Sequence, residues 1–175
     1  IFILTSLVLS VIANEVNLPL FHVVVELINI FIGFMIFIAA INSKVFSERN
    51  VLLSIGVAYL FVGVLDFMYL ISYLDAGIIE NTINMAESYW MAARLLEAAN
   101  ILIIFYLYSK KYKTRFKLTF ISHIFIVLLI ILMISNDIGV KLTDTNFGIA
   151  LELMLQIVIE LAYLAGLFFA LRLNF

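Results

Sequence analysis

Long apolar runs separated by short polar linkers constrain the fold of this sequence more than any other feature. A helix needs about 20 mostly apolar residues to cross a bilayer. Six such runs are predicted spans, the first of them cut short: 1–13, 21–41, 51–74, 88–109, 118–135 and 149–172. Hydrophobic residues make up 66% of the chain and charged residues only 13%, whereas soluble domains average roughly 45–50% and about 25%. We therefore expect an all-α, polytopic transmembrane helix bundle in contact with the lipid bilayer.

The charge of the linkers predicts the orientation of this bundle. The linker at 42–50 carries Lys44 and Arg49, and the linker at 110–117 carries five positive charges and no negative one. The linker at 75–87 is different, because it holds three acidic residues and no basic one. Short loops rich in Lys and Arg remain in the cytoplasm. This rule predicts that both ends of the chain face the cytoplasm.

Several classes of protein are excluded by composition and by missing motifs. The chain has no cysteine, which excludes disulfides and thiolate metal sites, and its net charge of −2 gives no reason to expect nucleic acid as a partner. It contains no Gly-rich phosphate loop, no nucleophile elbow and no zinc-protease motif, so we predict a non-catalytic segment. The sequence opens at Ile1 inside an apolar run. We expect residues 1–175 to be one domain of a longer protein.

Polar residues inside the predicted spans recur at helical spacing. Each ionisable group in a bilayer commonly costs about 2.5–3.5 kcal/mol, so such groups usually mark function. Residues three or four apart share one helix face, and at 1.5 Å per residue these residues fall in the outer half of the membrane. The cytoplasmic halves are almost purely apolar. We predict a ligand-binding pocket open to the outside, lined by His22, Glu26, Asp66, Tyr69, Arg94, Glu97, Glu152, Gln156 and Glu160.

The charge of this predicted pocket leaves three chemical options open. Its five carboxylates sum to −5, and Arg94 reduces this to −4. A low dielectric does not tolerate that charge, so the pocket must hold a metal ion, an organic cation or bound protons. His22 and Glu26 have the spacing of a helix-face metal pair, and together with Asp66 they are the predicted ligands for a divalent metal ion. Hydrogen bonding of His22 to a neighbour is the alternative.

Other polar side chains also have simpler interpretations. Arg94 can serve as a structural salt-bridge partner of Asp66 or Glu97. Tyr73, Tyr89 and Trp90 are typical of an aromatic belt at the membrane interface, with a cage around an ammonium group as the alternative. We interpret His123, near the cytoplasmic side, as an interfacial residue, and Asn100 as a bridge between helices.

Three strings in this order and spacing resemble a known family: His22 to Glu26, Gly56 to Asp66, and Trp90 to Glu97. They resemble the bacterial membrane-associated sensor domain of the third type over about residues 19–172. In that family a membrane sensor precedes cytoplasmic modules such as histidine kinases or diguanylate cyclases. The family often has a histidine three residues after the aspartate, where this chain has Tyr69, and this departure puts metal binding in doubt here.

The resemblance implies a sensory input domain in the bacterial inner membrane. The sixth predicted span would pass a signal from the outer pocket to an output module on the same chain, and such proteins usually dimerise through those modules. The runner-up hypothesis is a proton- or cation-coupled transporter, which buried carboxylates suit. Against it, the cytoplasmic half has no polar exit path and no helices broken by Gly or Pro.

Overall fold

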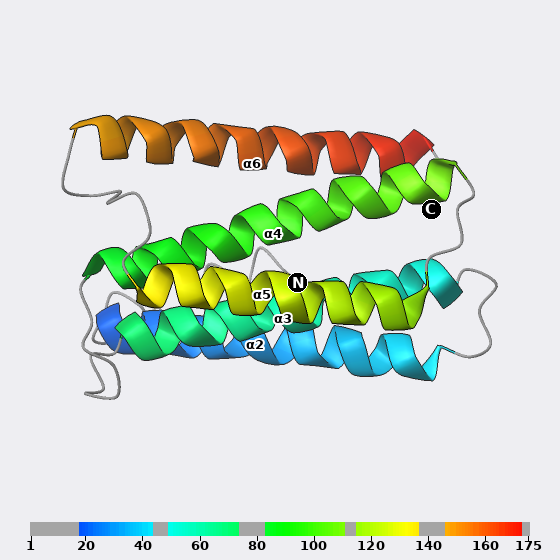
Figure 1. The fold of residues 1–175 in the computed structure, drawn as a ribbon, viewed down its shortest axis with the longest axis horizontal. Helices are drawn as coiled ribbons and strands as arrows, with labels where there is room; N and C mark the ends of the chain where they lie inside the picture. The colour runs from blue at the N-terminus through cyan, green and yellow to red at the C-terminus, as the bar shows by residue number, and fades with distance from the viewer. Residues whose placement is uncertain (1–17, 44–48, 74–82, 111–114, 137–145, 173–175) are drawn as a thin grey trace.

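The structure is a computed structural model that describes residues 18–43, 49–73, 83–110, 115–136 and 146–172. These residues form five α-helices and no strand: α2 (Leu18–Asn42), α3 (Arg49–Tyr73), α4 (Ile83–Ser109), α5 (Phe116–Ser135) and α6 (Asn146–Arg172). Each helix covers one predicted run to within a few residues, and the run at 1–13 lies outside the described residues. Successive helices point in opposite directions, so the helix ends next to the two basic linkers lie together (Figure 1).

Four of these helices have the length and composition of a membrane span. The four segments are His22–Asn42, Asn50–Tyr73, Met85–Ser109 and Phe116–Ser135. Helix α6 is 27 residues long but is not among them. Its apolar sequence is interrupted by Glu152 and Glu160. The all-α class is confirmed for the described part of the chain, while six spans and cytoplasmic ends stay predictions.

Helix α3 is the centre of the bundle. It packs on α2, α4 and α5, and half of its span is buried, against 17% for α2 and 11% for α5. A helix that is apolar all round suits such a position. Val57 and Leu65 of α3 and Ala93 of α4 are fully buried in the main core, and Tyr89 of α4 is almost fully buried there.

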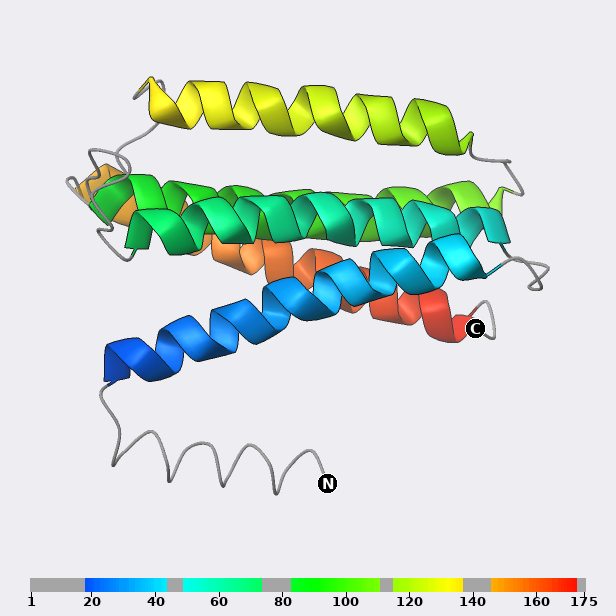
Figure 2. The same cartoon turned by 90° about the horizontal axis from the view of Figure 1, so that it is seen from below.

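The helices lie in three layers (Figure 2), with α5 on one side of α3 and α4 and with α2 and α6 on the other. Helix α6 packs on α4 alone among the described helices. The side of α3 and α4 that faces α2 and α6 carries the three cavities described below.

Small residues allow close approach between backbones, as is common in membrane bundles. A Cβ atom added to Gly56 of α3 would lie 2.5 Å from the Cβ of Ala40 and 3.3 Å from the Cα of Phe37 in α2. A Cβ atom on Gly166 of α6 would lie 2.4 Å from Cγ2 of Ile101 in α4. Glycine at these two positions therefore sets the spacing of the α2–α3 and α4–α6 pairs.

Candidate functional site

Arg94 is the centre of a polar network that joins three helices. Its Nη2 donates to both carboxylate oxygens of Asp66, at 2.7 and 2.6 Å, and its Nη1 donates to Oε2 of Glu97 at 2.7 Å. The hydroxyl of Tyr163 donates to the same oxygen of Glu97 at 2.8 Å. Asp66 lies on α3, Arg94 and Glu97 on α4, and Tyr163 on α6. One guanidinium thus connects the central helix, through Glu97, to the last helix.

This network is largely removed from solvent. The exposed fraction of the side chain is 5% for Asp66, 13% for Glu97 and 26% for Arg94. Two carboxylates and one guanidinium leave a charge of −1 if all three are ionised, which one bound proton or one cation would neutralise. The interpretation of Arg94 as a salt-bridge partner is confirmed, because its guanidinium pairs with both Asp66 and Glu97.

A cavity of about 380 Å³ lies at the end of the bundle where α2 begins and α3 ends, and four helices line it. Its lining residues are His22 and Glu26 of α2, Tyr69 of α3, Glu87, Trp90 and Met91 of α4, and Glu152 of α6. We call it the outer cavity. Three of these side chains are carboxylates, and none is Lys or Arg. The excess of negative charge favours a cation over an anion.

An aromatic cluster forms one wall of the outer cavity. The Nε2 atom of His22 is hydrogen-bonded to the hydroxyl of Tyr69. The ring of Tyr73 lies 4.9 Å from the ring of His22 and 5.8 Å from that of Tyr69, measured between centroids. The structure therefore shows the alternative interpretation of His22, in which its side chain is hydrogen-bonded to a neighbour. These contacts connect the start of α2 to the end of α3.

The predicted metal set of His22, Glu26 and Asp66 is not assembled in the structure. No group of three His, Asp or Glu side chains is placed to hold a metal ion among the described residues. Both oxygens of Asp66 accept hydrogen bonds from Arg94, and Asp66 lines a different cavity from the other two. Competition from a guanidinium leaves this carboxylate little capacity to coordinate a metal ion.

Asp66, Arg94 and Glu97 line a second cavity, of about 190 Å³, between α2, α3 and α4. Asn29 and Tyr59 complete its polar lining. The structure therefore distributes the predicted pocket residues over two cavities: His22, Glu26, Tyr69 and Glu152 lie in the outer cavity, and Asp66, Arg94 and Glu97 lie in the second.

The predicted pocket residues of α6 are also separated from one another. Gln156 donates from Nε2 to Oε1 of Glu152 at 3.1 Å, one turn along the helix. Glu160 is exposed and lines none of the three cavities. The structure thus leaves Glu160 apart from the other predicted pocket residues.

Glu87 and Tyr59 are two of the lining residues that sequence reasoning missed. Glu87 was assigned to an acidic linker, but it lies on α4 and lines the outer cavity. Tyr59 belonged to an apolar run and lines the second cavity. Helical spacing carried a signal for both, because Tyr59 precedes Asp66 by seven residues and Glu87 precedes Arg94 by seven, which is about two turns.

His123 is buried, so its interpretation as an interfacial residue is wrong. Its Nδ1 donates to the carbonyl of Thr119 at 2.7 Å, and its Nε2 lies 3.0 Å from the side-chain amide of Asn100. The atom of Asn100 in this contact is Oδ1, a hydrogen-bond acceptor. The predicted role of Asn100 as a bridge between helices is confirmed, here between α4 and α5.

A family model described as a membrane-associated sensor domain, MASE3, matches residues 13–174. No curated protein and no solved structure matches the chain.

Proposed function

The chain belongs to the MASE3 family of membrane-associated sensor domains, and from this premise we propose that its outer cavity binds a small cation and signals to a cytoplasmic output module. Membership of the family makes the chain a membrane-embedded sensory input domain rather than a catalytic one. It does not favour the transporter hypothesis. The ligand, the route of the signal and the output module are the proposed parts.

The outer cavity is the observation that carries this proposal. Glu26, Glu87 and Glu152 come from three different helices and line one cavity without a lining Lys or Arg. Without a ligand these carboxylates repel one another if they are ionised, and a bound cation would attract all three. Trp90 and Tyr69 add aromatic surface, which suits an organic ammonium ion as well as a hydrated metal ion.

Helix α6 provides a physical route from this cavity. It contributes Glu152 to the cavity and Tyr163 to the Arg94 network, and it ends at Arg172 beside the helix ends that adjoin the basic linkers. A cation that draws Glu152 toward Glu26 and Glu87 would shift α6 against α4. We propose that the end of α6 lies in the cytoplasm of a bacterial cell, with the chain in the inner membrane and the output module beyond residue 175. Dimerisation through that module is part of the same proposal.

The single tryptophan of the chain offers a direct test, because Trp90 lines the outer cavity. Trp90 fluorescence of the protein in lipid nanodiscs is recorded during titration with Mg²⁺ and, separately, with spermidine. We expect a saturable change with at least one cation, which the substitution Glu152→Gln weakens by about tenfold or more, since one charge-assisted contact is worth roughly 1.5–3 kcal/mol.

Glu160→Gln is the matched control, because Glu160 lies on the same helix and lines none of the three cavities. It should leave the titration unchanged. An unaltered response in the Glu152→Gln variant, or no response of the wild-type protein to either cation, would refute the proposed site.

A further inference from the structure

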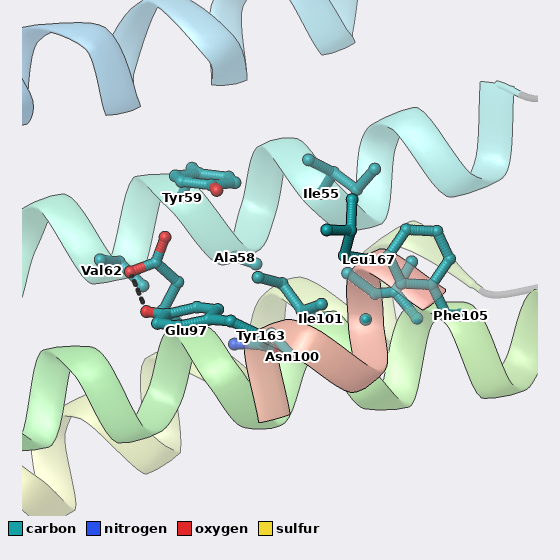
Figure 3. Close-up of a pocket in the computed structure, with 12 residues that line it drawn as sticks. Ile55, Ala58, Tyr59, Val62, Glu97, Asn100, Ile101, Phe105, Tyr163 and Leu167 are labelled. Atoms are coloured by element: carbon teal, nitrogen blue, oxygen red, sulfur yellow. Dashed lines mark hydrogen bonds between the residues drawn. The ribbon is translucent and has the colours of Figure 1, made fainter. Parts of the chain in front are cut away.

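A third cavity, of about 270 Å³, lies between α3, α4 and α6 (Figure 3). We call it the inner cavity. Most of its lining is apolar: Ile55, Ala58, Val62, Ile101, Ile104, Phe105, Gly166 and Leu167. Its volume exceeds the roughly 150 Å³ of an apolar protein cavity that accommodates benzene. The space therefore suffices for a short hydrocarbon chain or a small ring system.

The polar groups of the inner cavity are gathered toward one end. Figure 3 shows Tyr59, Glu97 and Tyr163 together there, with Phe105 and Leu167 at the other end. The hydroxyl of Tyr163 already donates to Glu97, so the oxygens of both side chains offer only lone pairs to a further partner. No Lys or Arg lines the cavity. The lining also includes Nδ2 of Asn100, a donor that is buried without a hydrogen-bond partner among the described residues, so an occupant that both donates and accepts a hydrogen bond fits this cavity.

The inner cavity is accessible from the side of the bundle. Helices α3 and α6 both flank α4 but do not pack on each other within the described part of the chain. The side chain of Leu167, at the apolar end, is 57% exposed. In a membrane that surface faces hydrocarbon chains. An occupant would therefore enter from the bilayer rather than from water.

We propose that the inner cavity binds a lipophilic molecule with one hydroxyl group, whose hydrocarbon part lies along α4 and whose hydroxyl donates to Glu97 or Tyr163. This ligand differs in chemistry from the cation of the outer cavity, and its binding does not depend on that proposal. It would contact the same pair of side chains that connects α4 to α6. Occupancy therefore acts directly on the polar link of α6 to the bundle.

Photoaffinity labelling with a decanol that carries a diazirine on its terminal carbon tests this proposal. The protein is reconstituted in lipid nanodiscs, labelled, digested and analysed by mass spectrometry. We expect saturable labelling of the lining segments 55–62 and 101–105, which unlabelled decanol displaces. Decane should need a concentration at least about tenfold higher, because a hydrogen bond to a charged acceptor is worth about 1.5–3 kcal/mol.

Two cavity variants and one control complete the experiment. Ala58→Phe fills the cavity from a buried position, while Leu167→Trp fills it from an exposed position that tolerates a larger side chain. Both should abolish the displaceable label. Ala99→Phe places the same added ring on the exposed face of α4, away from the cavity, and should keep it.

Three results would overturn the proposal. The first is labelling that spreads over the lipid-facing surface of α5 and is not displaced by decanol. The second is displacement by decane at the same concentration as decanol. The third is displaceable labelling at the wild-type level in a cavity variant that remains folded.

Discussion

Replacement of Arg94 tests whether the buried network stabilises the bundle. Arg94→Met removes the guanidinium and leaves Asp66 with its side chain 5% exposed and without its only described salt-bridge partner. Breaking a buried ion pair from one side costs about 3–5 kcal/mol, because the remaining charge is uncompensated. Hydrogen bonds between neutral groups in membrane proteins average only about 0.6 kcal/mol. We therefore expect the free energy of unfolding to fall by about 3 kcal/mol or more.

A second substitution separates charge from packing. Asp66→Asn in the Arg94→Met background removes the uncompensated carboxylate with almost no change in shape. We expect the double variant to recover about 1–2 kcal/mol relative to Arg94→Met alone, because a neutral amide costs less to bury than a charge. A purely steric role for Arg94 predicts no such recovery.

Reversible unfolding in mixed detergent micelles, followed by circular dichroism, measures these differences. Arg115→Met is the control, because Arg115 is exposed at the start of α5 and should change stability by no more than about 0.5 kcal/mol. The reasoning is refuted if Arg94→Met costs less than about 1 kcal/mol, or if the double variant is no more stable than Arg94→Met alone.

Two further predictions concern helix packing and use the same unfolding assay. Gly56→Ala should cost about 1–3 kcal/mol because its Cβ would meet α2 at 2.5 Å, whereas Gly63→Ala, whose Cβ would lie 3.7 Å from its nearest neighbour, should change stability by less than about 0.5 kcal/mol. Equal costs at the two glycines would contradict the α2–α3 spacing. Tyr163→Phe removes the hydrogen bond to Glu97 and should cost about 1.5–3 kcal/mol, with broader spin-label distances between α4 and α6. Tyr106→Phe is its control, because Tyr106 is 57% exposed, and a Tyr163→Phe variant as stable as wild type would show that this hydrogen bond contributes nothing.

The helices were predictable from the sequence because span length and linker polarity are local properties. The predicted runs at 118–135 and 149–172 correspond to α5 (Phe116–Ser135) and α6 (Asn146–Arg172). A run of apolar residues must be helical in a bilayer, since its backbone polar groups have no other partners there. The membrane environment therefore fixed the secondary structure without any knowledge of tertiary contacts.

The arrangement of the site was less predictable, because it depends on which helix faces meet. Helical spacing placed Asp66 and Arg94 on polar faces, but the pairing of these side chains, 28 positions apart, follows from the packing of α3 on α4. The sequence placed these residues at one depth in the membrane, whereas in the structure the outer cavity lies nearer the end of the bundle than the cavity of the Arg94 network, along the same three helices α2, α3 and α4. His123 is the clearest error, since its distance from the span end did not reveal that its face turns toward Asn100.

The single neighbour of α6 has a mechanical consequence. Among the described helices α6 rests on α4 alone, through a small apolar cluster that contains Ile159, and through the hydrogen bond from Tyr163 to Glu97. A helix that packs on a single neighbour can roll or slide without breaking contacts with any other described helix, so few contacts restrain its motion. A movement of α6 therefore requires only the α4–α6 contact to change and leaves the packing of α3 on α2, α4 and α5 intact.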